Sequence, residues 1–476
     1  MNEQPPPKRA IGRRVAYNTL TQMTGKAAVF AIAAASITIL TRYLGPEDYG
    51  RFSLALVYVQ MFGVLADVGL FTIVVRELSR SPERARELVG NALTIRLLLS
   101  VVVVAVAGLI GLALPYEPDV RLAILIAGVP LLFGLLTSSL TAKLQADLRM
   151  DRAALAETVG RAASLGGVVI VAALDLGFFA AIGAAGLGAL VTLLVTVAVV
   201  RGSLSIGFRA DLRLWRWLLT ASLPVGLALA INELYVRADT LMISLFRPIG
   251  DVGLYALSYR VIEIIGVFGG VLLGSVFAVL ARFDPGDQRF RSTVQAAWDV
   301  FTCAAVPLGL LGAVLAPGLI ELIAGSGFDG AAGPLRLLVF AAGLGFVNGV
   351  LGYALIAAEL QRRALWLNVA GLVVNVGLNL ALIPAFGIVA AAAVTVGSEG
   401  LVLVGGLVVT RRLLGFVPSP RVLLPALAVG VPVAVAAWVL RDAPVLAVGT
   451  GAGLVYVAGL YAISARAREL VAMGRG

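Results

Sequence analysis

The chain has 476 residues, of which 60% are hydrophobic and only 13% are charged, with a mean hydropathy of +0.99. Soluble globular domains carry about 25% charged residues, so the composition excludes that class. The net charge of +10 does not indicate nucleic acid, because basic excess in a membrane protein first reflects the positive-inside rule and anionic lipid head groups. The single Cys303 and the lack of histidine exclude an internal disulfide framework and histidine proton relays. We expect a phospholipid bilayer around the chain, no metal site and no cofactor.

Apolar runs long enough to cross roughly 30 Å of hydrocarbon recur from end to end. They predict an all-α polytopic membrane protein with about 14 transmembrane helices, and no secretory signal is expected ahead of the first span. The predicted spans are 17–41, 52–75, 89–113, 121–142, 153–174, 178–200, 217–246, 252–281, 293–316, 335–357, 364–384, 387–410, 421–440 and 443–464.

The basic residues give these spans an orientation. Of the 37 lysines and arginines, 26 fall in one alternate set of connections and six in the other, which leaves five inside spans. The positive-inside rule places the first set, and with it both termini, in the cytoplasm. No connection is long enough for a soluble catalytic domain. The nearest approach to a phosphate-binding G-x-x-x-x-G-K-[ST] loop is a bare Gly25-Lys26, so we expect neither ATP hydrolysis nor catalytic residues.

An internal repeat divides the chain. Residues 43–55 match 246–258, and residues 152–188 match 362–398 more weakly, including Gly177 against Gly387. An offset of six spans keeps both copies in one orientation, which is the parallel repeat of transporters that bind substrate between two halves. The predicted organisation is a basic cytoplasmic N-terminal segment (1–16), an N-lobe of spans 1–6 (17–201), a cytoplasmic linker (202–216), a C-lobe of spans 7–12 (217–412), spans 13–14 (413–464) and a cytoplasmic tail (465–476).

Ionisable residues concentrate in one predicted helical hairpin, residues 232–263, with the sequence NELYVRADTLMISLFRPIGDVGLYALSYRVIE. It carries Glu233, Arg237, Asp239, Arg260 and Glu263. A charge near the bilayer centre costs about 2.5–3.5 kcal/mol even on lenient insertion scales, so such residues usually face a cavity or a partner. Five ionisable residues in one hairpin therefore predict a functional site.

Further ionisable and polar residues lie at depth in other spans, and the charges do not follow the repeat. The helical framework is therefore repeated, whereas the charged residues within it differ between the two copies. Such a difference is expected if the two halves bind one asymmetric substrate. Candidate residues of a cationic substrate cavity are Lys26, Arg96, Arg161, Arg237 and Arg260. Candidate polar or coupling residues are Asp67, Glu233, Asp239, Tyr259, Glu263, Asn375 and Glu399.

Each candidate also has a structural interpretation. Helical spacing allows local ion pairs of Arg237 with Glu233, of Arg260 with Glu263 and of Arg161 with Glu157. Arg96 is close enough to the cytoplasmic end of its span to extend to the interface. Buried asparagines often hydrogen-bond neighbouring helices, and Asp48 and Asp251, at predicted external turns, are expected to cap helices.

A cationic cavity suits an anionic head group, and the planar arginine fork suits phosphate oxygens. A diphosphate with a long lipid tail could keep its tail in the bilayer while its head crosses, with tyrosines and asparagines beside its sugars. An antiporter of organic cations would favour an anionic pocket instead. A glycan polymerase or ligase would need a long charged external loop, whereas the longest one, Ala316 to Pro334, is glycine-rich and nearly uncharged. A purely structural scaffold leaves the buried, unrepeated charges unexplained.

Five segments carry a family resemblance: TRYLGPEDYGRFSLALVYV, LADVGLFTIVVREL, RADTLMISLF, VGLYALSYRVIE and LNLALIPAFGIVAAAAVT. In this order they resemble the polysaccharide-transporter branch of the multidrug/oligosaccharidyl-lipid/polysaccharide (MOP) exporter superfamily, which includes Wzx-type flippases of O-antigen and exopolysaccharide repeat units. The resemblance covers nearly the whole chain.

The resemblance implies two six-helix lobes in a V-shaped arrangement plus two C-terminal helices, in a bacterial inner membrane. It implies movement of undecaprenyl-diphosphate-linked glycan to the outer leaflet, with Lys26, Arg237 and Arg260 in the regions that bind diphosphate in related flippases. Glycan polymerases and glycosyltransferases are the partners it suggests. A lipid II flippase and a multidrug or metabolite cation antiporter of the same superfamily remain alternatives. The lack of histidine and of a sodium motif leaves the driving force open among membrane potential, a proton on Glu263 or Glu399, and extracellular polymerisation.

Overall fold

A computed structural model describes residues 8–464, 468 and 469, with only the backbone for residues 8–28 and 30. Most of the predicted cytoplasmic tail, residues 1–7 of the N-terminal segment and the side chain of Lys26 lie outside the described part. Within it the structure is helical, without strands. Its α-helices are α1 Lys8–Asp67, α2 Leu70–Arg80, α3 Ala85–Ala113, α4 Pro118–Ala146, α5 Met150–Ala173, α6 Gly177–Arg201, α7 Leu212–Phe246, α8 Ile249–Leu280, α9 Gln288–Ala324, α10 Ala332–Ala357, α11 Gln361–Leu414, α12 Leu423–Val439 and α13 Val445–Ile463. Two short 3-10 helices are η1 Pro82–Arg84 and η2 Ser326–Ala331.

The lengths of these helices fit a bilayer. Eleven helical stretches in the described residues are long and apolar enough to cross a membrane, and α12 is a shorter apolar helix. Two of the long stretches are interrupted by a glycine with positive φ, Gly45 in α1 (φ 66°) and Gly387 in α11 (φ 68°). The chain is a multi-pass all-α membrane protein, and the count of fourteen spans stays a prediction.

The chain forms two compact units, Met1–Glu233 (the N-terminal unit) and Leu234–Gly476 (the C-terminal unit). The boundary lies within α7. The predicted division at the linker 202–216 remains a proposal. Each unit is described below by itself.

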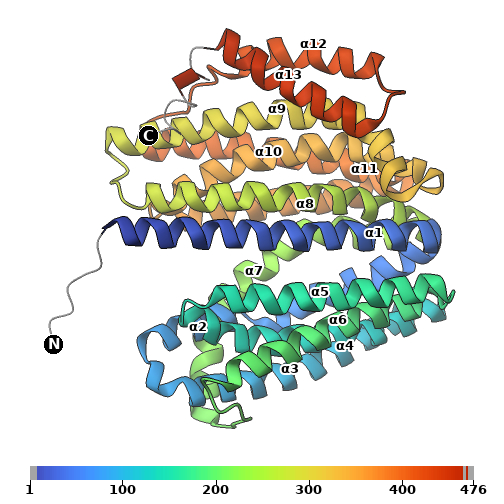
Figure 1. The fold of residues 1–476 in the computed structure, drawn as a ribbon, viewed down its shortest axis with the longest axis vertical. Coiled ribbons are helices and arrows are strands. Elements are labelled where there is room, and N and C mark those ends of the chain that lie inside the picture. The colour runs from blue at the N-terminus through green and yellow to red at the C-terminus, as the bar shows by residue number, and fades with distance from the viewer. Residues whose placement is uncertain (1–7, 465–467, 470–476) are drawn as a thin grey trace. The chain divides into compact units, whose positions relative to one another are not determined.

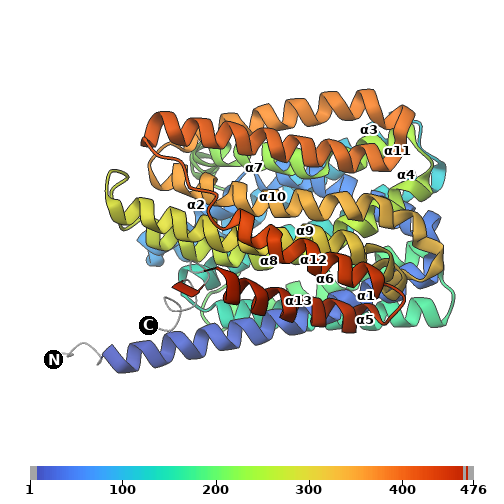
Figure 2. The ribbon, with the colours of Figure 1, turned by 90° about the horizontal axis from the view of Figure 1, so that it is seen from above.

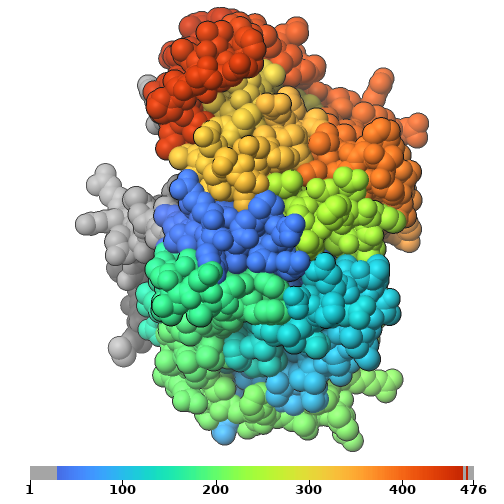
Figure 3. Space-filling view, turned by 90° about the vertical axis from the view of Figure 1, so that its right-hand side faces the viewer, coloured from blue at the N-terminus to red at the C-terminus, as the bar shows by residue number. Residues whose placement is uncertain are grey.

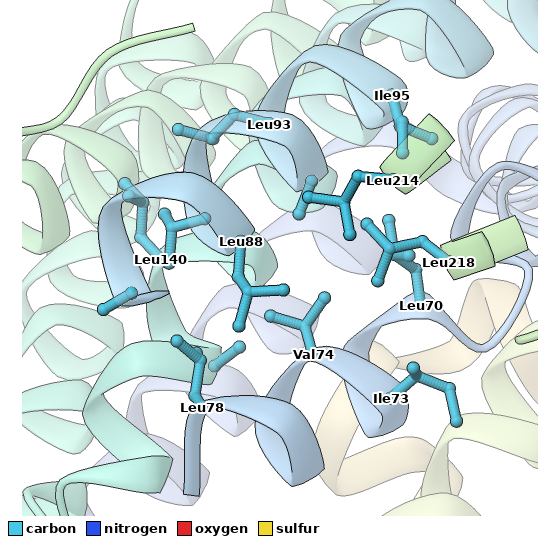
Figure 4. Close-up of a cluster of buried hydrophobic side chains, with 14 of the residues drawn as sticks. Leu70, Ile73, Val74, Leu78, Leu88, Leu93, Ile95, Leu140, Leu214 and Leu218 are labelled. Carbon is cyan, nitrogen blue, oxygen red and sulfur yellow. The ribbon is translucent and has the colours of Figure 1, made fainter. Parts of the chain in front are cut away.

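The N-terminal unit is a bundle in which α6 packs between α4 and α5, while α3 packs on α4 and α1 on α5 (Figure 1). Leucine and isoleucine side chains of α2, α3, α4 and the start of α7 point toward one another in its main apolar cluster (Figure 4). Leu214 and Leu218, at most 8% exposed, are the contribution of α7. The first part of α7 is therefore anchored in the N-terminal unit by apolar burial.

In the C-terminal unit, α10 packs against α8, α9 and α11. The last two helices, α12 and α13, lie side by side against α9 (Figure 2), and the space-filling view shows them (red) at the edge of this unit (Figure 3). Their apolar residues form a cluster of their own with Leu311 of α9, and Tyr456 Oη donates a hydrogen bond to the Cys303 carbonyl at 2.9 Å. The predicted appendix of two C-terminal helices thus packs on one helix of the repeat.

In each copy of the predicted repeat, a side chain of the first turn lies close to one of the two matched glycines. In the N-terminal unit, Tyr43 Oη accepts a hydrogen bond from the Gly177 amide at 2.7 Å. In the C-terminal unit, the Arg247 guanidinium lies against Gly387, where an added Cβ would be 3.4 Å from Nε. The glycine before the sixth helix of each copy has a positive φ, which glycine adopts at little cost. The two side chains come from neighbouring rather than matched positions of the repeat, because Tyr43 matches Phe246, the residue before Arg247.

The aspartates expected to cap helices at these turns form ion pairs. Asp48 pairs with Arg51 at 2.6 Å and Asp251 with Arg247 at 2.9 Å. No side chain caps the start of α8 with a hydrogen bond. An arginine one turn away therefore holds the Asp251 carboxylate in the first turn of α8, and the capping role of Asp251 stays a prediction.

The predicted span 52–75 is broken. α1 ends at Asp67, Val68 and Gly69 both have positive φ (48° and 74°), and α2 begins at Leu70. The apolar pattern of the sequence continues across this break, and Gly69 is the one residue in it that indicates an interruption of the helix. Helix α7 packs closely against the break: a Cβ added at Gly226 would lie 2.5 Å from the Val68 carbonyl.

Candidate functional site

Three charged residues of α7 and α8 meet in the C-terminal unit. Arg237 Nη2 lies 3.0 Å from Glu263 Oε1, and Arg260 Nη1 lies 2.7 Å from Glu263 Oε2. Arg260 and Glu263 share a face of α8 through i,i+3 spacing, while Arg237 reaches them from α7. The expected Arg260–Glu263 pair is present, and Glu263 also accepts Arg237. We name these three residues the arginine–glutamate triad.

Asp239, two residues after Arg237 on α7, is fixed by neutral donors. Its side chain is 3% exposed, and it accepts hydrogen bonds from Tyr255 Oη of α8 and from the Thr240 amide at 2.8 Å. The ring of Tyr259 packs one turn further along α8, 6.0 Å from that of Tyr255. Predicted candidates Asp239 and Tyr259 therefore lie on the same helix pair as the triad.

A second polar cluster joins α7, α10 and α11. Glu399 Oε1 accepts a hydrogen bond from Tyr235 Oη at 2.8 Å, and Oε2 accepts one from Asn348 Nδ2 at 2.6 Å. No basic side chain of the described residues forms an ion pair with Glu399. Neutral donors alone therefore hold this carboxylate, whereas arginines hold Glu263.

The two clusters contain charges of both signs. They hold two guanidiniums and three carboxylates, of Asp239, Glu263 and Glu399. Two of the five predicted basic residues, Arg237 and Arg260, converge in this unit, but acidic groups already accompany them. An incoming ligand would therefore meet guanidiniums that have a resident counter-charge.

In the N-terminal unit Arg96 of α3 is enclosed. Its side chain is 1% exposed and forms an ion pair with Asp67 at the end of α1. Arg96 Nη1 also donates to the Leu135 carbonyl and to the hydroxyls of Ser138 (2.7 Å) and Ser139 (3.1 Å) on α4. Rather than extending to an interface, Arg96 joins α3, α4 and the break in the second predicted span. We propose that Arg96 and Asp67 act by supporting the fold.

The remaining candidates lie apart from these clusters. Arg161 and Glu157 form the expected pair on α5 at 3.7 Å, with both side chains more than half exposed. Asn375 is buried and accepts a hydrogen bond from Asn379 Nδ2 at 3.0 Å. Glu233 is partly buried one turn before Arg237. The substrate roles of these residues, and that of Lys26, stay predictions.

The sequence reasoning missed Tyr235 and Asn348. Tyr235 precedes Asp239 by four residues and so shares its face of α7, which the i,i+4 rule could have found. Asn348 is an amide in the apolar helix α10, and such groups in membrane helices usually have a hydrogen-bond partner. Its partner Glu399 could not be assigned without the packing of α10 on α11.

The Glu399 cluster predicts a stability difference between two substitutions. Glu399→Ala removes the acceptor of two partly buried donors, and each unsatisfied group costs about 1–3 kcal/mol. Glu399→Gln can still accept from Asn348 while donating to the Tyr235 hydroxyl. We expect a clearly lower thermal unfolding midpoint in detergent for the alanine variant than for the glutamine variant. Glu321→Ala, an exposed carboxylate at the end of α9, is the control. Equal midpoints for both Glu399 variants would contradict the prediction.

Comparisons place this architecture in a family. A family model described as polysaccharide biosynthesis protein matches residues 15–283. This is more than half of the chain, and the chain belongs to this family. The comparison with curated proteins gives no match.

Solved structures share the fold at low sequence identity. A structure of the lipid II flippase MurJ in an inward closed conformation is 12% identical, with a TM-score of 0.78 over 95% of this chain and 100% of that one. A multidrug resistance MATE family transporter of the MOP superfamily is similar in its inward-facing conformation (16% identity, TM-score 0.62, 80% and 93% coverage). Its outward-facing conformation is also similar (17% identity, TM-score 0.60, 83% and 94% coverage). The likeness shows that this chain has the helical fold of these structures.

Proposed function

We propose that this protein is a lipid-linked oligosaccharide flippase. It moves undecaprenyl-diphosphate-linked glycan repeat units from the cytoplasmic to the outer leaflet of a bacterial inner membrane, by alternating access, for cell-surface polysaccharide such as O-antigen. The family supports the pathway, and similarity to a lipid II flippase supports a lipid diphosphate as cargo. A glycan polymerase and glycosyltransferases are the proposed partners, both termini are cytoplasmic, and no enzymatic activity is proposed.

The observation that carries this proposal is the convergence of Arg237 and Arg260. Two guanidiniums from adjacent helices each approach one oxygen of the same carboxylate, that of Glu263, so both already point at one anion position. Arginine forks favour phosphate oxygens, and hydrogen bonds to charged groups contribute about 1.5–3 kcal/mol each. A lipid diphosphate supplies enough oxygens for both.

The test is binding of undecaprenyl diphosphate to the purified protein, measured by native mass spectrometry. We expect retention by the wild type and loss in the Arg237→Ala/Arg260→Ala variant, because both donors of the anion position are removed. The corresponding double lysine variant should recover part of the binding, since it keeps the charges without the planar fork.

Arg84→Ala is the matched control, since it removes an arginine of the N-terminal unit that is not a candidate cavity residue and whose side chain, paired with Glu87, is 48% exposed. Equal binding by wild type and double alanine variant would contradict the proposal. Retention of the lipid II precursor over other undecaprenyl-diphosphate glycans would identify the lipid II alternative.

A second candidate function, export of organic cations, is favoured by one observation. Asp239, Glu263 and Glu399 lie in the same unit, and carboxylates attract cations. Retention of tetraphenylphosphonium by the wild type but not by Glu399→Gln, without diphosphate binding, would support this antiporter function.

A further inference from the structure

The triad contains its own anion. Glu263 uses both carboxylate oxygens, Oε1 toward Arg237 and Oε2 toward Arg260. These are the same donors that the proposed function assigns to a ligand phosphate. Because each guanidinium has five N–H donors, a phosphate can contact either arginine through its remaining N–H groups, but it can take the position between Arg237 and Arg260 only when Glu263 leaves it.

The three side chains of the triad differ in their exposure. The Arg237 side chain is 13% exposed, that of Glu263 25% and that of Arg260 44%. Arg237 is the enclosed member, and its neighbour Asp239 is buried and bonded to Tyr255 and Thr240. An incoming anion therefore meets Arg260 first and Arg237 last.

The charges favour an exchange. Glu263 offers one negative charge and two acceptor oxygens to two guanidiniums, whereas a diphosphate offers at least two charges and more oxygens. Displaced Glu263 is not enclosed, and its exposed fraction permits rehydration at low cost. The same carboxylate can return when the ligand leaves, so neither arginine stays buried without a counter-charge.

We propose that Glu263 is a resident counter-anion, which occupies the anion position of the empty protein and is displaced by the phosphate groups of the lipid-diphosphate ligand. This inference rests on the proposed function. Glu263 then sets the affinity of the site by competition, and it excludes ligands whose single charge does not compensate for its displacement. It is a specificity-determining residue rather than a contact of the bound ligand.

The inference predicts that a variant lacking the competitor binds more tightly. The probe is farnesyl diphosphate, titrated by calorimetry into the full-length purified protein in detergent. Glu263→Gln should lower the Kd about tenfold, the effect of one lost charge-assisted interaction in the competing state. Glu263→Asp, whose side chain is one methylene shorter, should give a smaller decrease. Bound ligand should also raise the unfolding midpoint of Glu263→Gln by more than that of the wild type.

Glu157→Gln is the matched control, because Glu157 also pairs with an arginine of its own helix but lies in the other unit. The Kd of this variant for farnesyl diphosphate should equal that of the wild type. The double variant Arg237→Ala/Glu263→Gln should bind weakly, which separates lost competition from nonspecific adsorption.

Equal or weaker binding by folded Glu263→Gln would overturn the inference while leaving the proposed function intact, provided that the wild type binds and the arginine variants do not. If Glu263→Gln does not fold, unchanged or weaker binding by Glu263→Asp would overturn it in the same way. Absence of diphosphate binding by the wild type would overturn both.

Discussion

Replacement of Arg96 by alanine is expected to remove most of the folded protein recovered from membranes. Arg96 is 1% exposed and joins Asp67 to the hydroxyls of Ser138 and Ser139. Breaking a buried ion pair by removing one partner costs about 3–5 kcal/mol, because the other charge stays buried. Stabilities of folded domains are about 5–15 kcal/mol. Size-exclusion chromatography after detergent extraction, followed by thermal unfolding, measures the loss.

Two further variants separate charge burial from lost substrate contact. Arg161→Ala, at an exposed pair of the same unit, should leave yield and unfolding midpoint unchanged. The double variant Asp67→Leu/Arg96→Met should recover much of the yield, since apolar replacement of a whole buried pair is often neutral or stabilising. A well-folded Arg96→Ala protein that has lost only ligand binding would contradict a supporting role and return Arg96 to the substrate site.

The sequence was sufficient for features that depend on local periodicity. Apolar runs predict the helices, and the i,i+3 spacing of Arg260 and Glu263 predicts the pair that is present on α8. The match of Gly177 with Gly387 predicts equivalent turns, because a positive φ is a property of the residue type as well as of the fold.

Contacts between helices could not be predicted in the same way. Periodicity places Arg237 on a face of α7 but not the rotation of that face toward α8, so the structure adds Glu263 of α8 as a partner beside the local Glu233 alternative. Tyr235 and Glu399 are separated by 164 residues. The spacing of Arg96 from its helix end suggested an interfacial residue, whereas the packing of α3 on α4 encloses it.

The break at Val68 and Gly69 predicts the second large effect. Gly226 of α7 faces it so closely that an added Cβ would lie 2.5 Å from the carbonyl carbon and oxygen of Val68. These are backbone atoms, which cannot rotate away as a side chain can. Gly226→Ala should therefore destabilise the protein by about 1–3 kcal/mol, the usual effect of overpacking, and Gly226→Val by more. The unfolding midpoint and the yield of monodisperse protein measure both variants.

Gly134→Ala separates this collision from the general effect of adding a methyl group to a helical glycine. Gly134 lies on α4 of the same unit with nothing within 4 Å of an added Cβ, so its replacement should be neutral or stabilising by about 0.5–1 kcal/mol. The two substitutions have opposite expected effects on stability because the added methyl group meets backbone atoms at Gly226 and open space at Gly134. If Gly226→Ala proved as stable as Gly134→Ala, α7 would have to leave the break at Val68 with little loss of free energy. The apolar cluster that contains Leu214 and Leu218 would then still hold its first part in the N-terminal unit.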